Sequence, residues 1–301
     1  MTRKINKIKQ IMNNTFDKIR SNANCHPFVK WAGGKTQLIS LLNQHLPKQF
    51  NHYIEPFLGG GALFFSLINN KRMLFKSSLS DNNKELINSY LVIKNNIDEL
   101  TELLKEYEIQ YKKDQEKFYY YLRDIKNVSD GVENAARFIT LNKTCYNGLY
   151  RVNKSGWFNV PIGRYKNPKI CDEVNLRKIS QTLTKTDTIV FTDDYRNSIN
   201  INKVDENSFI YLDPPYDPIN STSSFTAYTK KGFGKSDQIE LSLLFRKLSD
   251  RNCKVMMSNS DTSLVRQLYR AFDIVSVSTK RQINSVGTKR INHQEVIIKN
   301  Y

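Results

Sequence analysis

Cysteine is scarce in this chain of 301 residues, and its spacing excludes the structures that cysteine most often builds. The four cysteines, Cys25, Cys145, Cys171 and Cys253, lie far apart, and no two of them form a CxxC pair. This pattern favours neither a zinc site nor a disulfide framework. We therefore expect no bound metal and a reducing compartment.

Long apolar runs are also missing from the chain. No stretch approaches the roughly 18 apolar residues that are needed to cross a bilayer. The N-terminus, "MTRKINKIKQIMNN", is basic and lacks the continuous apolar core of a signal peptide. We therefore expect a soluble, cytoplasmic protein without a membrane partner. Residues 1–25 are expected to form a basic, disordered extension, and the alternative is an arm that contacts DNA.

The stretch "FVKWAGGKTQLI", residues 28–39, contains Gly-Lys-Thr but lacks a glycine that a phosphate-binding P-loop requires. That motif has a glycine five positions before the glycine of Gly-Lys-Thr. Counted back from Gly34, the position is Val29, a β-branched residue that suits such a turn poorly. The sequence therefore gives no ATPase signature here, and a turn before an amphipathic helix remains an alternative.

Acidic residues are few, 29 against 46 basic ones, and the net charge of +17 favours a polyanionic partner. The charge is also unevenly distributed. Residues 81–133 contain twelve acids and eight bases, whereas residues 134–171 contain seven bases and no acid. A second acid-free stretch, residues 274–294, carries Lys280, Arg281, Lys289 and Arg290. Because a uniform bias in composition would not segregate charge, we predict a nucleic-acid partner.

Strand and helix signals predict an α/β fold. The strand "HYIEPF" is followed by the glycine run 59–61, the helical stretch "ALFFSLI" and the strand "MLFKSSLSD", which ends in Asp81. This order is typical of a doubly wound half that binds a nucleoside cofactor, and Phe64 replaces the third glycine of the dinucleotide version. Five further strands are predicted in "DTIVFTDDY", "SFIYLDPPYDP", "CKVMMSNSD", "FDIVSVSTK" and "EVIIKNY". Residues 84–142 are expected to be helical, and residues 142–168 to form loops and hairpins.

The tetrapeptide Asp213-Pro214-Pro215-Tyr216 directly follows the apolar strand "SFIYL". Its two prolines end the strand and stiffen a loop at the strand's carboxyl end, where open α/β sheets bind ligands. The Asp213 carboxylate and the Pro214 carbonyl could accept both hydrogens of a planar amino group while Tyr216 stacks on its ring. The alternative, an acidic turn on the surface, remains open from these four residues alone.

Taken together, the sequence blocks resemble the Dam family of DNA adenine-N6 methyltransferases, including the GATC methyltransferases of restriction systems. The blocks occur in the family's order: "FVKWAGGKTQLI", "IEPFLGGGALFF", "LSDNNKELI", "NGLYRVNKSGWFNVPIGRYKNP", "YLDPPYDP" and "FTAYTKKGF". The resemblance extends from about residue 28 to the C-terminus. It implies a Rossmann-like S-adenosylmethionine-dependent methyltransferase domain with a mostly helical, hairpin-containing insertion that recognises DNA.

The resemblance also implies roles for individual residues. It implies catalysis by Asp213, Pro214, Pro215 and Tyr216. It implies that S-adenosyl-L-methionine is bound by Trp31, Lys35, Phe57, Gly59, Gly61, Asp81 and Asp213. Asp194 and Tyr195 occupy the positions that read the cofactor's adenine, although Asp193 replaces the family's usual glycine. A DNA-probing hairpin would contain Tyr146, Asn147, Leu149, Arg151 and the neighbouring Pro161, and Lys280 and Arg281 are expected to contact phosphates.

We therefore expect N6-adenine methylation of double-stranded DNA at GATC by direct methyl transfer to a flipped base. The expected domains are the catalytic residues 26–90 and 186–301, and a target-recognition insertion, residues 91–185. We expect a monomer; the sequence leaves open whether it is functionally paired with a GATC restriction endonuclease or acts alone. The alternatives are a methyltransferase of RNA or protein, which commonly carries NPPY, and a DNA-binding relative without catalysis.

Overall fold

The computed structural model describes residues 25–31, 33–35, 38–70, 75–126, 129–218, 233–279 and 293–301. Within these residues, the strands form one seven-stranded sheet in the order β3-β2-β1-β4-β5-β7-β6. The strands are β1 (His52–Glu55), β2 (Lys76–Asp81), β3 (Thr188–Thr192), β4 (Ser208–Leu212), β5 (Lys254–Ser260), β6 (Asp273–Thr279) and β7 (His293–Lys299). All seven predicted strands are therefore confirmed, and the fold is the expected Rossmann-like one.

Strands β3, β2, β1, β4 and β5 run parallel, whereas β7 runs antiparallel between β5 and β6. In a parallel sheet the carboxyl ends of all strands lie at the same edge. The strand order reverses between β1 and β4. From β1 the chain continues to β2, which pairs with one side of β1, whereas the later strand β4 pairs with the other side. This is the point at which open α/β sheets bind their ligands.

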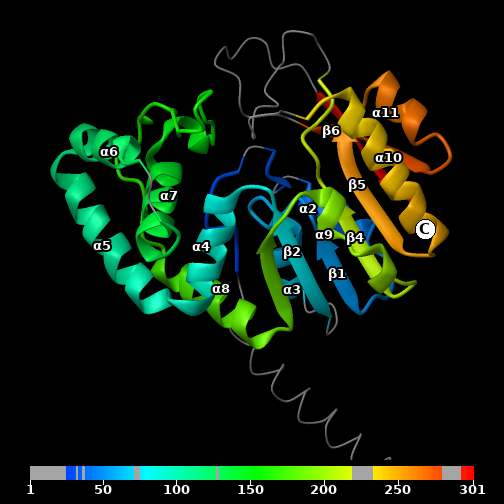
Figure 1. Ribbon diagram of the computed structural model, residues 1–301, viewed down its shortest axis with the longest axis horizontal. Helices are drawn as coiled ribbons and strands as arrows, with labels where there is room; N and C mark the ends of the chain where they lie inside the picture. Colours follow the sequence, from blue (N-terminus) through cyan, green and yellow to red (C-terminus); the bar gives the residue numbers. More distant parts are fainter. Residues whose placement is uncertain are drawn as a thin grey trace, which may run out of the picture.

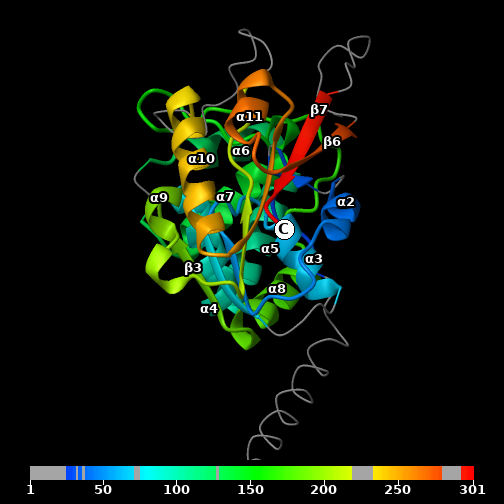
Figure 2. The same cartoon turned by 90° about the vertical axis from the view of Figure 1, so that its right-hand side faces the viewer.

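Helices cover both faces of the sheet. In Figure 2, α2 (Ile39–Gln44) and α3 (Ala62–Asn69) lie on one face, and α9 (Tyr195–Ser198) and α10 (Lys235–Asp250) lie on the other. The central strand β4 serves both layers, because successive side chains of a strand point to opposite faces. Phe209 and Tyr211 belong to the core with α2 and α3, whereas Ile210 and Leu212 belong to the core with α10 and α11 (Ser263–Leu268).

A mostly helical region between β2 and β3 lies beside the sheet in Figure 1. It contains α4 (Lys84–Asn95), α5 (Ile97–Lys113), α6 (Gln115–Asp124), α7 (Val132–Thr144) and α8 (Glu173–Lys185). Polar caps begin two of these helices, since Asn83 accepts a hydrogen bond from the Leu86 amide and Asp114 accepts one from the Lys117 amide. Helix α4 packs against both α7 and α8, and α4 continues through residue 90. The division into domains at residues 90 and 186 stays a prediction.

Between α7 and α8 the chain forms the expected hairpin. Antiparallel bridges join Cys145 to Ile162 and Val152 to Phe158. The short 3-10 helix η2 (Tyr146–Gly148) lies at its base and contains Asn147 with a φ of 55°. Asparagine tolerates this left-handed conformation better than most side chains. No helix among the described residues is both long and apolar enough to pass through a bilayer.

Candidate active site

The residues singled out from the sequence converge where β1, β2 and β4 end. Asp213 follows the last residue of β4, the glycine turn follows β1, and Asp81 ends β2. Residues of β1 pair with both β2 and β4 in parallel register, which places these three ends side by side. The site is therefore assembled by the backbone of the sheet.

Asp213 forms an ion pair with Lys35. Lys35 Nζ lies 2.7 Å from Asp213 Oδ1, and 19% of the Asp213 side chain is exposed. Burial raises the pKa of Asp213 to about 6, an effect that Lys35 opposes and the nearby Glu295 reinforces. Above pH 6 the carboxylate form is therefore available to accept hydrogen bonds.

Lys35 is itself buried, with 5% of its surface exposed. Its ammonium donates a hydrogen bond to the carbonyl of Gly33 and lies 4.6 Å from the centre of the Tyr216 ring. A cation at this distance from an aromatic face is attracted by the ring's quadrupole. One buried cation therefore contacts both ends of the tetrapeptide 213–216.

The loop that follows β4 is held from three elements. Gln238 of α10 donates to the Pro215 carbonyl at 3.1 Å. Asn259 of β5 accepts from the Asp217 amide at 3.2 Å and donates to Gln238 at 3.0 Å. The Tyr216 hydroxyl donates to Glu295 Oε2, on β7, at 2.8 Å. Pro214 is buried, which adds to the stiffness that two consecutive prolines give the loop.

The glycine turn and Asp81 form the second part of the site. The Gly59 amide donates to Asp81 Oδ2 at 2.9 Å, and the Asn83 amide donates to Oδ1 at 2.9 Å. Burial raises the pKa of Asp81, and these amide hydrogen bonds oppose the rise. Each carboxylate oxygen keeps a further lone pair, so Asp81 can still accept hydrogen bonds from the hydroxyls of a ribose.

Gly59 also makes room for Trp31. Its φ is +48°, and a Cβ at this position would lie 2.6 Å from Trp31 Cδ1. Trp31 in turn stacks on Tyr150 of the hairpin, with ring centres 5.7 Å apart and planes inclined by 25°. Trp31 therefore contacts the glycine turn on one side and the hairpin on the other.

Aromatic side chains lie at the neighbouring strand ends. Phe57 stacks on Tyr195 at 5.1 Å between ring centres, and Phe233 contacts both rings. Asp194 caps α9 and forms an ion pair with Arg196 at 3.0 Å. Tyr195 and Asp194 are the two residues predicted to contact a cofactor's adenine. Tyr195 lies among aromatic rings, whereas the Asp194 carboxylate is paired with Arg196.

Two acidic residues that sequence reasoning missed lie beside this site. Glu55 ends β1 with 2% of its surface exposed and accepts a hydrogen bond from the Tyr53 hydroxyl at 2.9 Å. Burial, followed by the charges of Asp213 and Asp81, holds the pKa of Glu55 well above its ordinary value. Glu295 is the second. It is also buried, and it accepts the hydrogen bond from the Tyr216 hydroxyl.

The site thus fits S-adenosyl-L-methionine. The fit is indicated by a tight glycine turn, in which a Cβ on Gly59 would collide with Trp31, and by a carboxylate at the end of β2 that can accept hydrogen bonds from ribose hydroxyls. Among the described residues, no group of three or more His, Cys, Asp or Glu side chains could hold a metal ion.

The predicted DNA-probing residues lie together in the hairpin. Tyr146 is 43% exposed and its amide donates to the Pro161 carbonyl at 2.9 Å. Arg151 is exposed, and its guanidinium donates to the side chain of Asn159 at 2.8 Å and to the Asn159 carbonyl at 3.2 Å. Asn147 is exposed and Leu149 half-buried. Lys280 and Arg281, like Lys289 and Arg290, lie outside the described residues.

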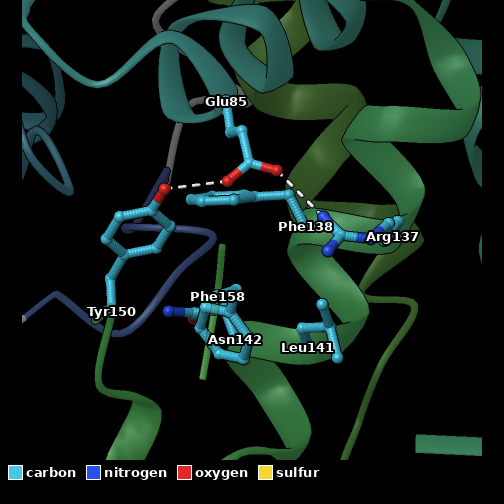
Figure 3. A pocket seen from close by; sticks show the side chains of 7 residues that line it. All are labelled: Glu85, Arg137, Phe138, Leu141, Asn142, Tyr150 and Phe158. Carbon is cyan, nitrogen blue, oxygen red and sulfur yellow. Dashed lines mark hydrogen bonds and ion pairs between the residues drawn. The ribbon is translucent and has the colours of Figure 1, made fainter. Parts of the chain in front are cut away.

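A polar junction joins the hairpin to helices α4 and α7. Figure 3 shows Glu85, in the first turn of α4, between the guanidinium of Arg137 and the hydroxyl of Tyr150. Arg137 Nη1 donates to Glu85 Oε1 at 2.9 Å, and the Tyr150 hydroxyl donates to Oε2 at 2.8 Å. The junction borders a small pocket that is also lined by Phe138, Leu141, Asn142 and Phe158. Glu85 thus fixes the same tyrosine that stacks on Trp31.

Three asparagine side chains clamp the segment that precedes Trp31. Asn69, Asn175 and Asn142 each exchange two hydrogen bonds with the backbone of one residue, and these residues are Cys25, His26 and Lys30, respectively. Asn142 also donates to the Gly148 carbonyl of the hairpin at 3.2 Å. Asparagines at scattered positions carry no motif, so sequence reasoning could not find this clamp.

Comparison with known proteins identifies relatives over most of the chain. Residues 31–283 match the family described as D12 class N6 adenine-specific DNA methyltransferases. The chain is 47% identical over 294 residues to the type II methyltransferase M.MjaIII of Methanocaldococcus jannaschii, covering 91% of this chain and 99% of that protein. It is 38% identical over 289 residues to the type II methyltransferase M1.LlaDCHI of Lactococcus lactis subsp. cremoris, covering 94% and 98%. It is 33% identical over 270 residues to the DNA adenine methylase of Escherichia coli K12, covering 90% and 93%.

Proposed function

The chain belongs to the family of D12 class N6 adenine-specific DNA methyltransferases, and from this premise we propose that it methylates the adenine of GATC in double-stranded DNA. It is an enzyme that acts on DNA adenine. The finer proposal comprises S-adenosyl-L-methionine as the methyl donor, extrusion of the target base and the sequence GATC. A single observation carries the proposed cofactor and target-base sites: the loop 213–216 lies beside Lys35 at the sheet edge that also holds the glycine turn and Asp81.

Binding of the cofactor would use the second part of the site. S-Adenosyl-L-methionine supplies a methyl group activated by a positively charged sulfur. Asp81 would accept hydrogen bonds from the ribose hydroxyls, and the turn at Gly59 would allow close approach of the backbone. Phe57 and Trp31 would border the cofactor, since both adjoin this turn.

The target adenine would enter beside the loop 213–216. A base inside a duplex is out of reach, and its extrusion costs a few kcal/mol. Stacking on Tyr216 would recover roughly 1–3 kcal/mol if single-strand stacking energies apply. The Asp213 carboxylate and the Pro214 carbonyl would each accept one hydrogen of the N6 amino group and so orient its nitrogen.

The transfer itself needs no covalent enzyme intermediate. The bound cofactor would supply its methyl group to N6, whose two hydrogens Asp213 and Pro214 would hold, and would be left as an uncharged thioether, while the surplus proton on N6 would pass to water. Asp213 stabilises the positive charge that develops on N6, because a fixed carboxylate in a site of low dielectric acts strongly on a nearby charge. Lys35 keeps Asp213 ionised by lowering its pKa.

Recognition of GATC would be carried by the hairpin. Arg151 would grip guanine O6 and N7. Tyr146, Asn147, Leu149 and Pro161 belong to the same hairpin. The names of two relatives as type II methyltransferases support pairing with a restriction endonuclease. We further propose that the protein acts as a monomer in the cytoplasm.

The test is transfer of labelled methyl groups from S-adenosyl-L-methionine to duplexes that contain or lack GATC. Label on N6 of adenine in GATC duplexes alone is the expected result. Asp213→Ala should reduce transfer on the order of 100-fold or more while duplex affinity persists, because it removes charge stabilisation and leaves the hairpin intact. Asp250→Ala, at the exposed end of α10, is the matched control. Label on other sequences would refute GATC, and label on RNA or protein alone would refute the proposed substrate.

A further inference from the structure

Glu295 lies on a strand that is paired on both sides. In β7 it is opposite Ser260 of β5 and Val277 of β6. Its side chain has 8% of its surface exposed, and the next residue, Val296, is fully buried. Because its backbone is held by two neighbouring strands and its side chain is buried, the Glu295 carboxylate is a fixed point beside the loop that follows β4.

This fixed point holds the far end of the Tyr216 side chain. The Tyr216 hydroxyl donates to Glu295 Oε2 at 2.8 Å. Burial, followed by the charges of Asp213 and Glu295, holds the pKa of Tyr216 well above its ordinary value. The hydroxyl therefore remains a donor throughout the working pH range, and its acceptor is the kind of carboxylate that makes stronger hydrogen bonds than a neutral group.

The near end of Tyr216 is held separately. The carbonyl of Pro215 and the amide of Asp217 are bound by Gln238 and Asn259, respectively. With the backbone fixed, rotation about the Cα–Cβ bond would still sweep the ring through its rotamers. A hydrogen bond at the hydroxyl removes this freedom, and because a phenolic O–H prefers the ring plane, the bond also biases the tilt of the ring.

We infer that Glu295 is a positioning residue for methyl transfer: through the Tyr216 hydroxyl it sets the plane of the ring against which the extruded adenine stacks. This inference rests on the proposed function, because it requires that a base occupies the site beside Tyr216. It assigns Glu295 no contact with the base or the cofactor. Its contribution is that the ring is already oriented when the base arrives, so that the base does not have to order it.

A purely structural role for Glu295 makes a different prediction. If Glu295 only stabilised the sheet, its replacement would lower the unfolding temperature and act independently of the Tyr216 hydroxyl. If it acts through the hydroxyl, the two changes must be non-additive, because each removes the same hydrogen bond. A double-mutant cycle separates these cases.

The experiment measures single-turnover methylation of a GATC duplex at saturating enzyme and S-adenosyl-L-methionine. It is run at pH 8, where Asp213, with a pKa of about 6, is ionised. The variants are Glu295→Ala, Glu295→Gln, Tyr216→Phe and both double combinations. Gln294→Ala is the matched control, since Gln294 is the exposed neighbour of Glu295 on β7.

Glu295→Ala and Tyr216→Phe should each slow transfer on the order of tenfold, as expected for loss of a hydrogen bond to a charged group. The double variant should be no slower than either single one. Glu295→Gln should retain part of the rate, because its amide oxygen can still accept. Cofactor affinity and the Gln294→Ala rate should remain at wild-type values. Fluorescence of 2-aminopurine at the target position should show a less ordered extruded base in Glu295→Ala.

Multiplicative losses in the double variant, or wild-type rates in both Glu295 variants, would overturn the inference. If Glu295→Ala fails to fold, the Glu295→Gln cycle decides in the same way, with a smaller expected effect. Failure of the proposed function is distinguished beforehand, because in that case the wild-type protein would not label the GATC duplex.

Discussion

The ammonium of Lys35 lies 2.7 Å from a carboxylate oxygen of Asp213, so the loop after β4 is tied electrostatically to the segment that contains Lys35. Lys35 reaches this position from a segment that is clamped by Asn69, Asn175 and Asn142. The pair therefore joins two segments of the site that are far apart in sequence. Its charge balance also sets the pH range in which Asp213 is ionised.

The first prediction concerns that pH range. Because Asp213 has a pKa of about 6, kcat/KM for the duplex should fall as the pH drops through 6 and the carboxylate is protonated. Lys35 lowers this pKa, so Lys35→Met should move the acidic limb upward by roughly one pH unit. Lys35→Arg keeps the charge and should leave the limb near its wild-type position. An unmoved limb in Lys35→Met would contradict the assignment.

The same group affects folding stability with a defined sign. Its pKa is raised in the folded state, above an ordinary value of 3.8. The folded protein therefore binds this proton more tightly than the unfolded chain, and the associated stability is present below pH 3.8 and lost as the pH rises through about 6. The pH rise that ionises Asp213 therefore also lowers the stability of the folded protein.

A second prediction uses two neighbouring glycines. Gly59→Ala would place a methyl group 2.6 Å from Trp31 in a residue whose φ is +48°, so Trp31 or the turn must shift. Cofactor affinity, measured by calorimetry, should fall by roughly tenfold, in line with the cost of backbone strain. Gly60→Ala is the control, because its Cβ would meet Pro27 at an ordinary 3.4 Å. Equal affinities of the two variants would show that the Gly59 turn does not shape the cofactor site.

A third prediction tests base reading by Arg151. Arg151→Ala should reduce discrimination at one guanine of GATC by about 10- to 100-fold, the value of one bidentate contact. The measurement compares kcat/KM on duplexes in which one base pair at a time is changed. Lys154→Ala removes a charge from the exposed turn of the same hairpin and should lower affinity for all duplexes alike. A uniform loss in Arg151→Ala as well would identify a phosphate contact.

A fourth prediction compares two of the clamping asparagines. Asn142→Ala and Asn175→Ala each leave a backbone amide and carbonyl without their partner, which should cost roughly 2–4 kcal/mol of unfolding free energy in chemical denaturation. Only Asn142 also holds the Gly148 carbonyl of the hairpin. Asn142→Ala should therefore weaken discrimination between duplexes as well, whereas Asn175→Ala should not. Similar losses of discrimination in both variants would locate the effect in the clamped segment alone.

Much of the fold could be predicted from sequence because its signals are local. Each strand is a short apolar run bounded by turn residues, and the helices of residues 84–142 have regular apolar spacing. The spacing between Gly59 and Asp81 indicated a shared site, and in the structure the amide of one donates to the carboxylate of the other. The order of the motifs thus correctly predicted that Gly59 and Asp81 lie together at the carboxyl ends of β1 and β2.

The residues that were missed are those whose partners are distant in sequence. Glu295 stands in an ordinary strand, "HQEVIIK", and only the pairing of β7 with β5 brings it to Tyr216. Glu85 reads as an acid in the first turn of a helix, where it complements the helix dipole. Its contacts with Arg137 and Tyr150 depend on how α7 and the hairpin pack against α4. Tertiary packing sets these contacts, so spacing along the chain does not reveal them.

The pairing of β1 with β4 has a consequence for synthesis of the protein. While the ribosome is still translating the helices after α4, one edge of β1 lacks its partner, because β4 begins only at Ser208. Unpaired strand edges invite association with other chains, so this interval is when the nascent protein is most exposed to misassembly. Since β7, with Glu295, is made after the loop 213–216, a chain released between the two would carry that loop and lack the carboxylate that accepts the Tyr216 hydroxyl.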